Sequence, residues 1–159
     1  MFLIKREGYD NFITSKNPQL SNFYSNIRRQ FGILVKNNKP IGEKWSFDHP
    51  DKRDTWEGKD LNQVWREYYS RLVDSVSFGI FDIIGHCDLI KVFGDRPEGE
   101  LSQLWRPFLE AVKQSDIAIE INTGGIHKPC GEMYPEPALL EMAGGMGVGL
   151  TFGSDSHKS

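Results

Sequence analysis

The sequence has only two cysteines in its 159 residues, Cys87 and Cys130, too few for a disulfide framework or a four-cysteine zinc site. It also lacks any run of about 18 apolar residues, so we expect no segment of it to span a membrane. Residues 1–7 carry charge where a secretory signal needs an apolar stretch. We therefore expect a cytoplasmic protein.

Several catalytic motifs are missing as well. The sequence contains no Gly-x-Ser-x-Gly nucleophile elbow and no phosphate-binding P-loop. The glycine-rich stretch 144–149 follows an expected helix and precedes an expected strand, the reverse of the dinucleotide-binding order. Cys87 neighbours His86, but adjacent residues on a strand point to opposite faces, so we interpret Cys87 as a buried, inert thiol.

Apolar residues make up 38% and charged residues 26% of the sequence, as in a soluble globular protein. The net charge of −3 argues against nucleic acid as the main partner. Residues 1–54 carry 10 Lys and Arg against 6 Asp and Glu, whereas residues 55–159 carry 9 against 16. This change in composition suggests two segments of different origin, which we divide into 1–45 and 46–159.

The apolar pattern of the first segment predicts a helix over residues 18–31 and a short strand over 33–35. This segment is therefore expected to be a helical extension with one short strand.

The second segment alternates between strand and helix patterns. Strands are predicted near 80–85, 117–121 and 148–152, and helices near 61–78, 101–114 and 136–144. Asp60 is expected to cap the first of these helices, and Pro107 to kink the second or to mark its start. The alternation predicts an α/β fold with parallel strands, whose chemistry gathers at the C-terminal strand ends.

Each predicted strand is followed by side chains that can bind a metal ion. These are His86 and Asp88, then Glu120 and Asn122, then Asp155 and His157. Imidazole and carboxylate groups that converge from several elements suit a divalent metal, which can activate water against a phosphate. A lone His-x-Asp pair is also found as a salt-bridged structural histidine, but three such strand ends favour a metal site.

The loop over residues 122–128 could receive an anion, because its glycines let backbone amides approach a phosphate and His127 and Lys128 add positive charge. A solvated loop with a surface lysine explains the same residues equally well. Lys91 and Arg96 raise the same pair of alternatives, and for Arg96 we favour a charged rim.

Four stretches resemble the polymerase-and-histidinol-phosphatase (PHP) family, closest to histidinol phosphatase, over about residues 46–159. They are residues 47–56, 81–91, 120–125 with Tyr134 and Pro135 following, and 153–157. The resemblance implies a distorted (β/α)7 barrel, of which about three βα units are present here. It also implies hydrolysis of histidinol phosphate, a small phosphomonoester, in histidine biosynthesis.

By position in that family, His86, Asp155 and His157 would bind a divalent metal, Mn, Fe or Zn, with no catalytic residue beyond the metal ligands. Lys91, Asn122, His127 and Lys128 would lie on the substrate side. Family members usually have Arg where His127 stands. The His-x-His pair of the family's first motif and the Glu and His ligands of its second are absent, so the site is expected to be incomplete and turnover feeble or absent.

Residues 2–48 resemble a different family, the iron–sulfur photolyase-related flavoproteins, through the stretches 23–34 and 39–48. Two alternatives to a phosphatase follow. The chain could be a DNA-binding fragment that contacts phosphates through Arg28, Arg29 and Lys44, although for the two arginines we favour a solvated helix end, where positive charge suits the helix dipole. It could instead be a non-catalytic remnant that needs a partner chain or a second copy to complete the barrel.

Overall fold

In a computed structural model of the chain, residues 2–5, 47–77 and 81–153 are described. The predicted helix over 18–31 and strand over 33–35 lie outside these ranges, as do Asp155 and His157. The chain divides into two compact units, one of Met1–Lys5 with Lys59–Ser159 and the other of Arg6–Gly58. Within the described ranges, no helix combines the length and apolar character needed to cross a membrane.

A four-stranded sheet forms the centre of the larger unit, in the order β1-β2-β3-β4. The strands are β1 (Phe2–Lys5), β2 (Phe81–Gly85), β3 (Ala118–Asn122) and β4 (Gly149–Gly153). β2, β3 and β4 are mutually parallel, which confirms the predicted α/β fold with three parallel strands. β1 pairs antiparallel with β2 and was not predicted as a member of this sheet.

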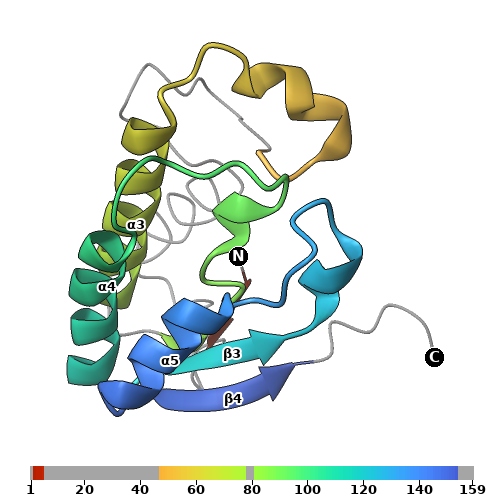
Figure 1. The fold of residues 1–159 in the computed structure, drawn as a ribbon. Helices are drawn as coiled ribbons and strands as arrows, with labels where there is room; N and C mark the ends of the chain where they lie inside the picture. Colours follow the sequence, from red (N-terminus) through yellow and green to blue (C-terminus); the bar gives the residue numbers. More distant parts are fainter. Residues whose placement is uncertain (1, 6–46, 78–80, 154–159) are drawn as a thin grey trace, which may run out of the picture. The chain divides into compact units, whose positions relative to one another are not determined.

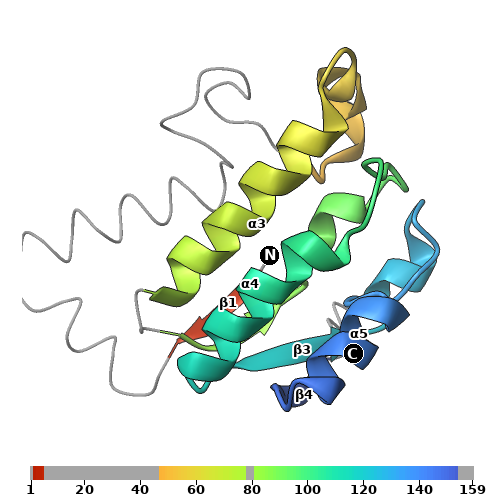
Figure 2. The same cartoon turned by 60° about the vertical axis from the view of Figure 1, so that its left-hand side comes forward.

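Three helices accompany the sheet: α3 (Leu61–Ser77), α4 (Ser102–Gln114) and α5 (Pro137–Gly145). They agree with the predicted helices to within one or two residues. Figure 1 shows α3 and α4 side by side, and Figure 2 shows both in front of the strands with α5 beside α4. Because α4 begins at Ser102, Pro107 lies inside it and does not mark its start.

Aromatic side chains fill the contact between α3 and α4. The ring of Tyr69 on α3 meets the ring of Phe108 on α4 edge-on, with centroids 5.9 Å apart, and Trp65 stacks on Tyr69 at 6.2 Å. Trp65 and Phe108 are wholly buried. Aromatic pairs of this kind contribute roughly 0.5–1.5 kcal/mol beyond the burial of their area, so this contact orients α3 against α4.

The smaller unit is described only for residues 47–58. It holds a 3-10 helix, η2 (Pro50–Trp56), preceded by His49, whose ring nitrogen accepts a hydrogen bond from the Asp51 amide at 3.2 Å. The indole of Trp56 donates to the carbonyl of Phe47 at 3.0 Å. Both hydrogen bonds are made between residues of this segment.

The start of α3 depends on Asp60, as the sequence predicts. Its Oδ1 accepts hydrogen bonds from the amides of Asn62 at 2.9 Å and Gln63 at 3.2 Å. We expect Asp60→Ala to lower the free energy of unfolding by about 1 kcal/mol, because both amides lose their acceptor. Urea unfolding measures this. Asp60→Asn keeps the acceptor and should stay close to wild type; an equal loss in both variants would contradict the capping role.

Candidate active site

His86 lies directly after β2 and is buried. Its backbone has a positive φ of 49°, a region that non-glycine residues seldom occupy. Two contacts from other elements hold it: the hydroxyl of Tyr68 on α3 donates to the His86 carbonyl at 3.3 Å, and the Tyr134 ring lies 5.0 Å from the imidazole. The left-handed backbone at His86 ends the extended conformation of β2.

Glu120 on β3 faces that imidazole. Its Oε2 lies 3.3 Å from His86 Nδ1, and both side chains are largely buried. Its Oε1 accepts from the Asn122 side chain at 3.3 Å. Gly153 leaves the room for this carboxylate, because a Cβ built there would lie 1.7 Å from Glu120 Oε1. The glycine at the end of β4 therefore leaves the space that the Glu120 carboxylate of β3 occupies.

Asn122, predicted on the substrate side, is wholly buried and ties two segments together. Its backbone exchanges hydrogen bonds with Tyr134 at 2.6 and 2.8 Å, and its Oδ1 accepts from the Gly124 amide at 2.7 Å. The residue thus brings Tyr134 beside the end of β3. Its side-chain nitrogen donates to Glu120 Oε1, which connects Asn122 to the site.

Lys91, also predicted on the substrate side, is instead at the centre of a partly buried charged cluster. The cluster consists of Asp88, Lys91, Arg96, Glu132 and Glu136. The Lys91 ammonium lies 2.8 Å from Asp88 Oδ2 and 3.2 Å from Glu132 Oε2, and donates to the Met133 carbonyl at 2.7 Å. Lys91 has no exposed surface, so its ammonium group pairs with carboxylates of the protein itself.

Arg96 completes the charged cluster from the other side. Its Nη2 lies 2.8 Å from Glu132 and 2.9 Å from Glu136, and its guanidinium lies over the Trp65 ring at 5.5 Å. The favoured interpretation of Arg96 as a charged rim is therefore incomplete, since it also links the segment 132–136 to α3. The sequence offers no sign of this link, because Arg96 and Glu132 are 36 residues apart.

Burial has the largest effect on the pKa of two members of the cluster, Asp88 and Glu136. It raises the pKa of Asp88, and the Lys91 ammonium opposes that rise. Burial also raises the pKa of Glu136, against the opposing charges of Arg96 and Lys91. The Cys87 thiol is wholly buried and burial raises its pKa, which agrees with the interpretation of Cys87 as inert.

The loop after β3 folds as a 3-10 helix, η4 (Gly124–His127), and some of its backbone amides donate to carbonyls within the same loop. The Ile126 amide donates to Thr123 at 3.1 Å and the Lys128 amide to Gly125 at 3.0 Å. Gly125 is needed for packing, since a Cβ there would lie 2.1 Å from the Glu132 carbonyl oxygen. His127 and Lys128 are exposed, so their contact with an anion stays a prediction.

Of the three predicted metal ligands, His86 is the one that lies in the described ranges. Glu120 Oε2 lies 3.3 Å from His86 Nδ1 without forming a hydrogen bond, and a carboxylate beside the second nitrogen is common for imidazoles that bind metal. Among residues 2–5, 47–77 and 81–153, no group of three or more His, Cys, Asp or Glu side chains is placed to hold a metal ion. The other two predicted ligands, Asp155 and His157, lie outside the described ranges.

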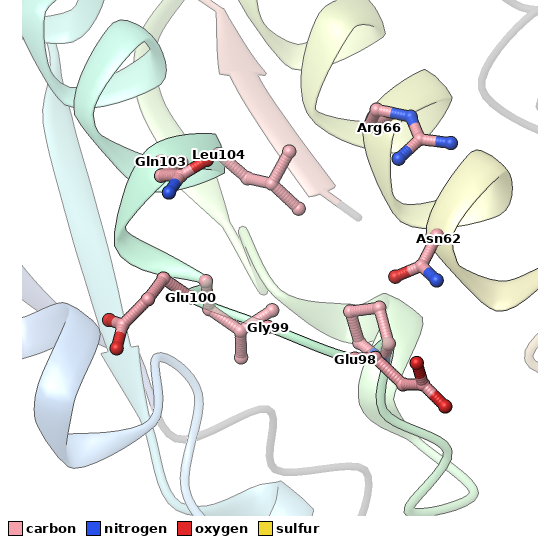
Figure 3. A pocket seen from close by; sticks show the side chains of 9 residues that line it. Asn62, Arg66, Glu98, Gly99, Glu100, Gln103 and Leu104 are labelled. Carbon is pink, nitrogen blue, oxygen red and sulfur yellow. The ribbon is translucent and has the colours of Figure 1, made fainter.

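A separate groove of about 230 Å³ lies where α3 and α4 begin. Figure 3 shows Asn62 and Arg66 of α3 on one side and Gln103 and Leu104 of α4 on the other. Its lining, drawn from the described part of the chain, includes none of the predicted site residues. We do not associate it with the chemistry of the strand ends.

Known histidinol phosphatases are similar to most of this chain. A relative from Deinococcus radiodurans assigned as a histidinol phosphatase is 36% identical over 114 residues, which is 72% of this chain and 43% of the relative. A histidinol phosphatase from Bacillus subtilis is 28% identical over 108 residues, 62% of this chain and 40% of the relative. The chain spans about two fifths of the length of these curated relatives.

A solved structure gives the same fold. A chain from Listeria monocytogenes assigned as a histidinol phosphatase superposes with a TM-score of 0.66 at 23% identity, over 86% of this chain and 58% of that chain. The two relatives show histidinol-phosphatase (PHP) homology over most of the chain, and the solved structure shows the shared fold.

A second family covers the N-terminal half. The family model described as deoxyribodipyrimidine photo-lyase-related protein matches residues 1–80, half of the chain, and the chain belongs to that family. A match of 114 residues within 159 can start no later than residue 46, so both similarities include α3.

The charged cluster yields a stability test. We expect Lys91→Met to lower the free energy of unfolding by about 3–5 kcal/mol, because it leaves the buried Asp88 carboxylate beside two further carboxylates without its closest cation. Adding Asp88→Asn should recover part of the loss. Chemical unfolding of the single and double variants measures both effects, and a loss of under about 1 kcal/mol in Lys91→Met would contradict a structural role for the pair.

Proposed function

We propose that residues 46–159 form part of a metal-dependent phosphomonoester hydrolase domain and that histidinol phosphate is its substrate. The observation that supports this most is the 36% identity to a relative assigned as a histidinol phosphatase. The proposed architecture is a partial (β/α)7 barrel of about three βα units, preceded by a photolyase-related segment over residues 1–45, whose residues 2–5 join the sheet as β1. Its place of action would be the cytoplasm.

In this proposal, His86, Asp155 and His157 bind one divalent ion, Mn, Fe or Zn. When bound, the ion would lower the pKa of a coordinated water and neutralise phosphate charge. Glu120 lies beside His86 Nδ1 and would hold the ring so that Nε2 points to the ion.

The substrate side is proposed to consist of Asn122, His127 and Lys128. His127 and Lys128 are exposed after β3, where a phosphate can reach them from solvent. We propose that Lys91 acts indirectly, since its ammonium already contacts Asp88 and Glu132. It would hold Tyr134 near the imidazole rather than touch the substrate.

Turnover by this chain is expected to be feeble or absent, because the ligands of the family's first two motifs do not occur in the sequence. A single ion held by three ligands can bind phosphate, but it does not provide the clamp of a multi-metal site. Binding of metal and phosphate is therefore a more direct test than hydrolysis.

A second candidate function is binding of DNA by the N-terminal segment. The match of residues 1–80 to a photolyase-related family favours it. Arg28, Arg29 and Lys44 would contact phosphates, so the affinity for duplex DNA should fall steeply as salt is added. Affinity that is absent at low salt would dismiss this candidate without affecting the first.

Metal content tests the primary proposal. We expect the purified chain to bind about one equivalent of Mn, Fe or Zn, and Asp155→Asn and His86→Gln to lose it, because three ligands are the fewest that hold such an ion in a site with an open position. His49→Gln is the matched control, since His49 caps η2 and should leave the metal content unchanged. Elemental analysis measures all four proteins.

Absence of metal from the wild-type chain after incubation with excess Mn and Zn would reject the proposal. If metal is present, assays on histidinol phosphate beside a generic aryl phosphate would then separate a specific substrate from general phosphomonoester hydrolysis.

The role of Glu120 has a test of its own, on β4. Gly153→Ala should weaken metal binding by about 10–100-fold, because the new Cβ displaces the Glu120 carboxylate from His86. Gly149→Ala is the control on the same strand, where the nearest atoms lie at an ordinary 3.8 Å. Titration calorimetry compares the two variants, and equal affinities would show that Glu120 does not position His86.

A further inference from the structure

The β4 strand has an unusual surface for the edge of a folded sheet. Among the described residues, β3 is its only strand partner, and Figure 1 shows β4 along the outer side of β3. Phe152 is 83% exposed and Leu150 is 41% exposed. These two side chains are two residues apart on a strand, so they lie on the same face of the sheet.

Nothing in the sequence of β4 discourages a further strand from pairing with it. Natural edge strands are usually protected by a charged side chain, a proline or a bulge. The strand Gly149–Gly153 reads Gly-Leu-Thr-Phe-Gly, with no charge and no proline, and it pairs with β3 in unbroken register. By contrast, β1, at the other end of the strand order, ends in Lys5 and has an irregular register there.

The strand is also complementary to itself. If two copies of β4 pair antiparallel about a two-fold axis through Thr151, then Thr151 faces its own copy and Leu150 faces Phe152 of the second chain. The dimer thereby contains two such pairs, each with a large aliphatic side chain opposite an aromatic one. Glycines 149 and 153 face each other at the ends and leave the backbones free to approach.

We propose that the protein forms a two-fold symmetric dimer through antiparallel pairing of β4 with β4 of a second copy. The pairing would join the two four-stranded sheets into one and satisfy the outward backbone groups of both edges. An isologous contact of this kind closes after two copies. Pairing of β4 with β1 of another chain would continue indefinitely, and Lys5 disfavours it.

The oligomeric state provides the first test. We expect light scattering of the full chain to give twice the monomer mass, falling toward the monomer on dilution. Phe152→Lys should be monomeric at concentrations where wild type is dimeric, because the lysine charge would be buried beside Leu150 of the second copy. Ile126→Lys is the matched control: Ile126 is also apolar and 52% exposed, but it lies on η4 outside the strand.

A monomeric wild type at all concentrations would overturn the proposal. Equal loss of the dimer in Phe152→Lys and Ile126→Lys would also overturn it, since the contact would then be general apolar association. Circular dichroism of each variant checks that the fold is retained, which is expected because both side chains are exposed in the single chain.

Cysteine cross-linking tests the register without removing any apolar contact. In a Cys130→Ser background, Thr151→Cys should form an intermolecular disulfide under mild oxidation, because residues facing each other across the axis lie within bonding range. Leu150→Cys should not, since the two copies of residue 150 are offset by two residues along the strands, beyond the roughly 7 Å limit. Cross-linking of Leu150→Cys in preference to Thr151→Cys would reject this register.

Discussion

The ion pair between Lys91 and Asp88 is the contact on which the rest of the site depends. It joins the turn after β2 to the segment 132–136, because Asp88 also accepts the Glu136 amide at 2.7 Å and Lys91 also binds the Met133 carbonyl. That segment carries Tyr134, which packs on His86 and bridges to Asn122. A buried charge pair of this kind is costly to break, so the ends of β2 and β3 are held in one arrangement.

The helices and the parallel strands could be predicted from the sequence because their signals are local. Apolar spacing of three and four residues marks α3 and α4, and Asp60 stands at the expected start of α3. β1 was not predicted as part of the sheet because four residues carry too little pattern, and its pairing with β2 joins residues about 80 positions apart.

The candidate site was only partly predictable for a related reason. The sequence places His86, Glu120 and Asn122 at strand ends, and the fold brings them together as expected from parallel strands. It does not reveal that Lys91 is buried among carboxylates, because Glu132 and Glu136 read as ordinary charged loop residues. Nor does it reveal that Gly153 is small to accommodate Glu120, a constraint that exists only across the β3–β4 pair.

The helix α3 is shared by the two family similarities, and this has an evolutionary consequence. A gene fusion that joins two unrelated domains usually places the junction in a linker, where neither core is disturbed. Here the two ancestries overlap in a helix whose buried stripe, from Val64 to Val76, packs against α4. Both families are therefore matched by the same apolar spacing in α3, so one helix sequence meets the packing requirement of both.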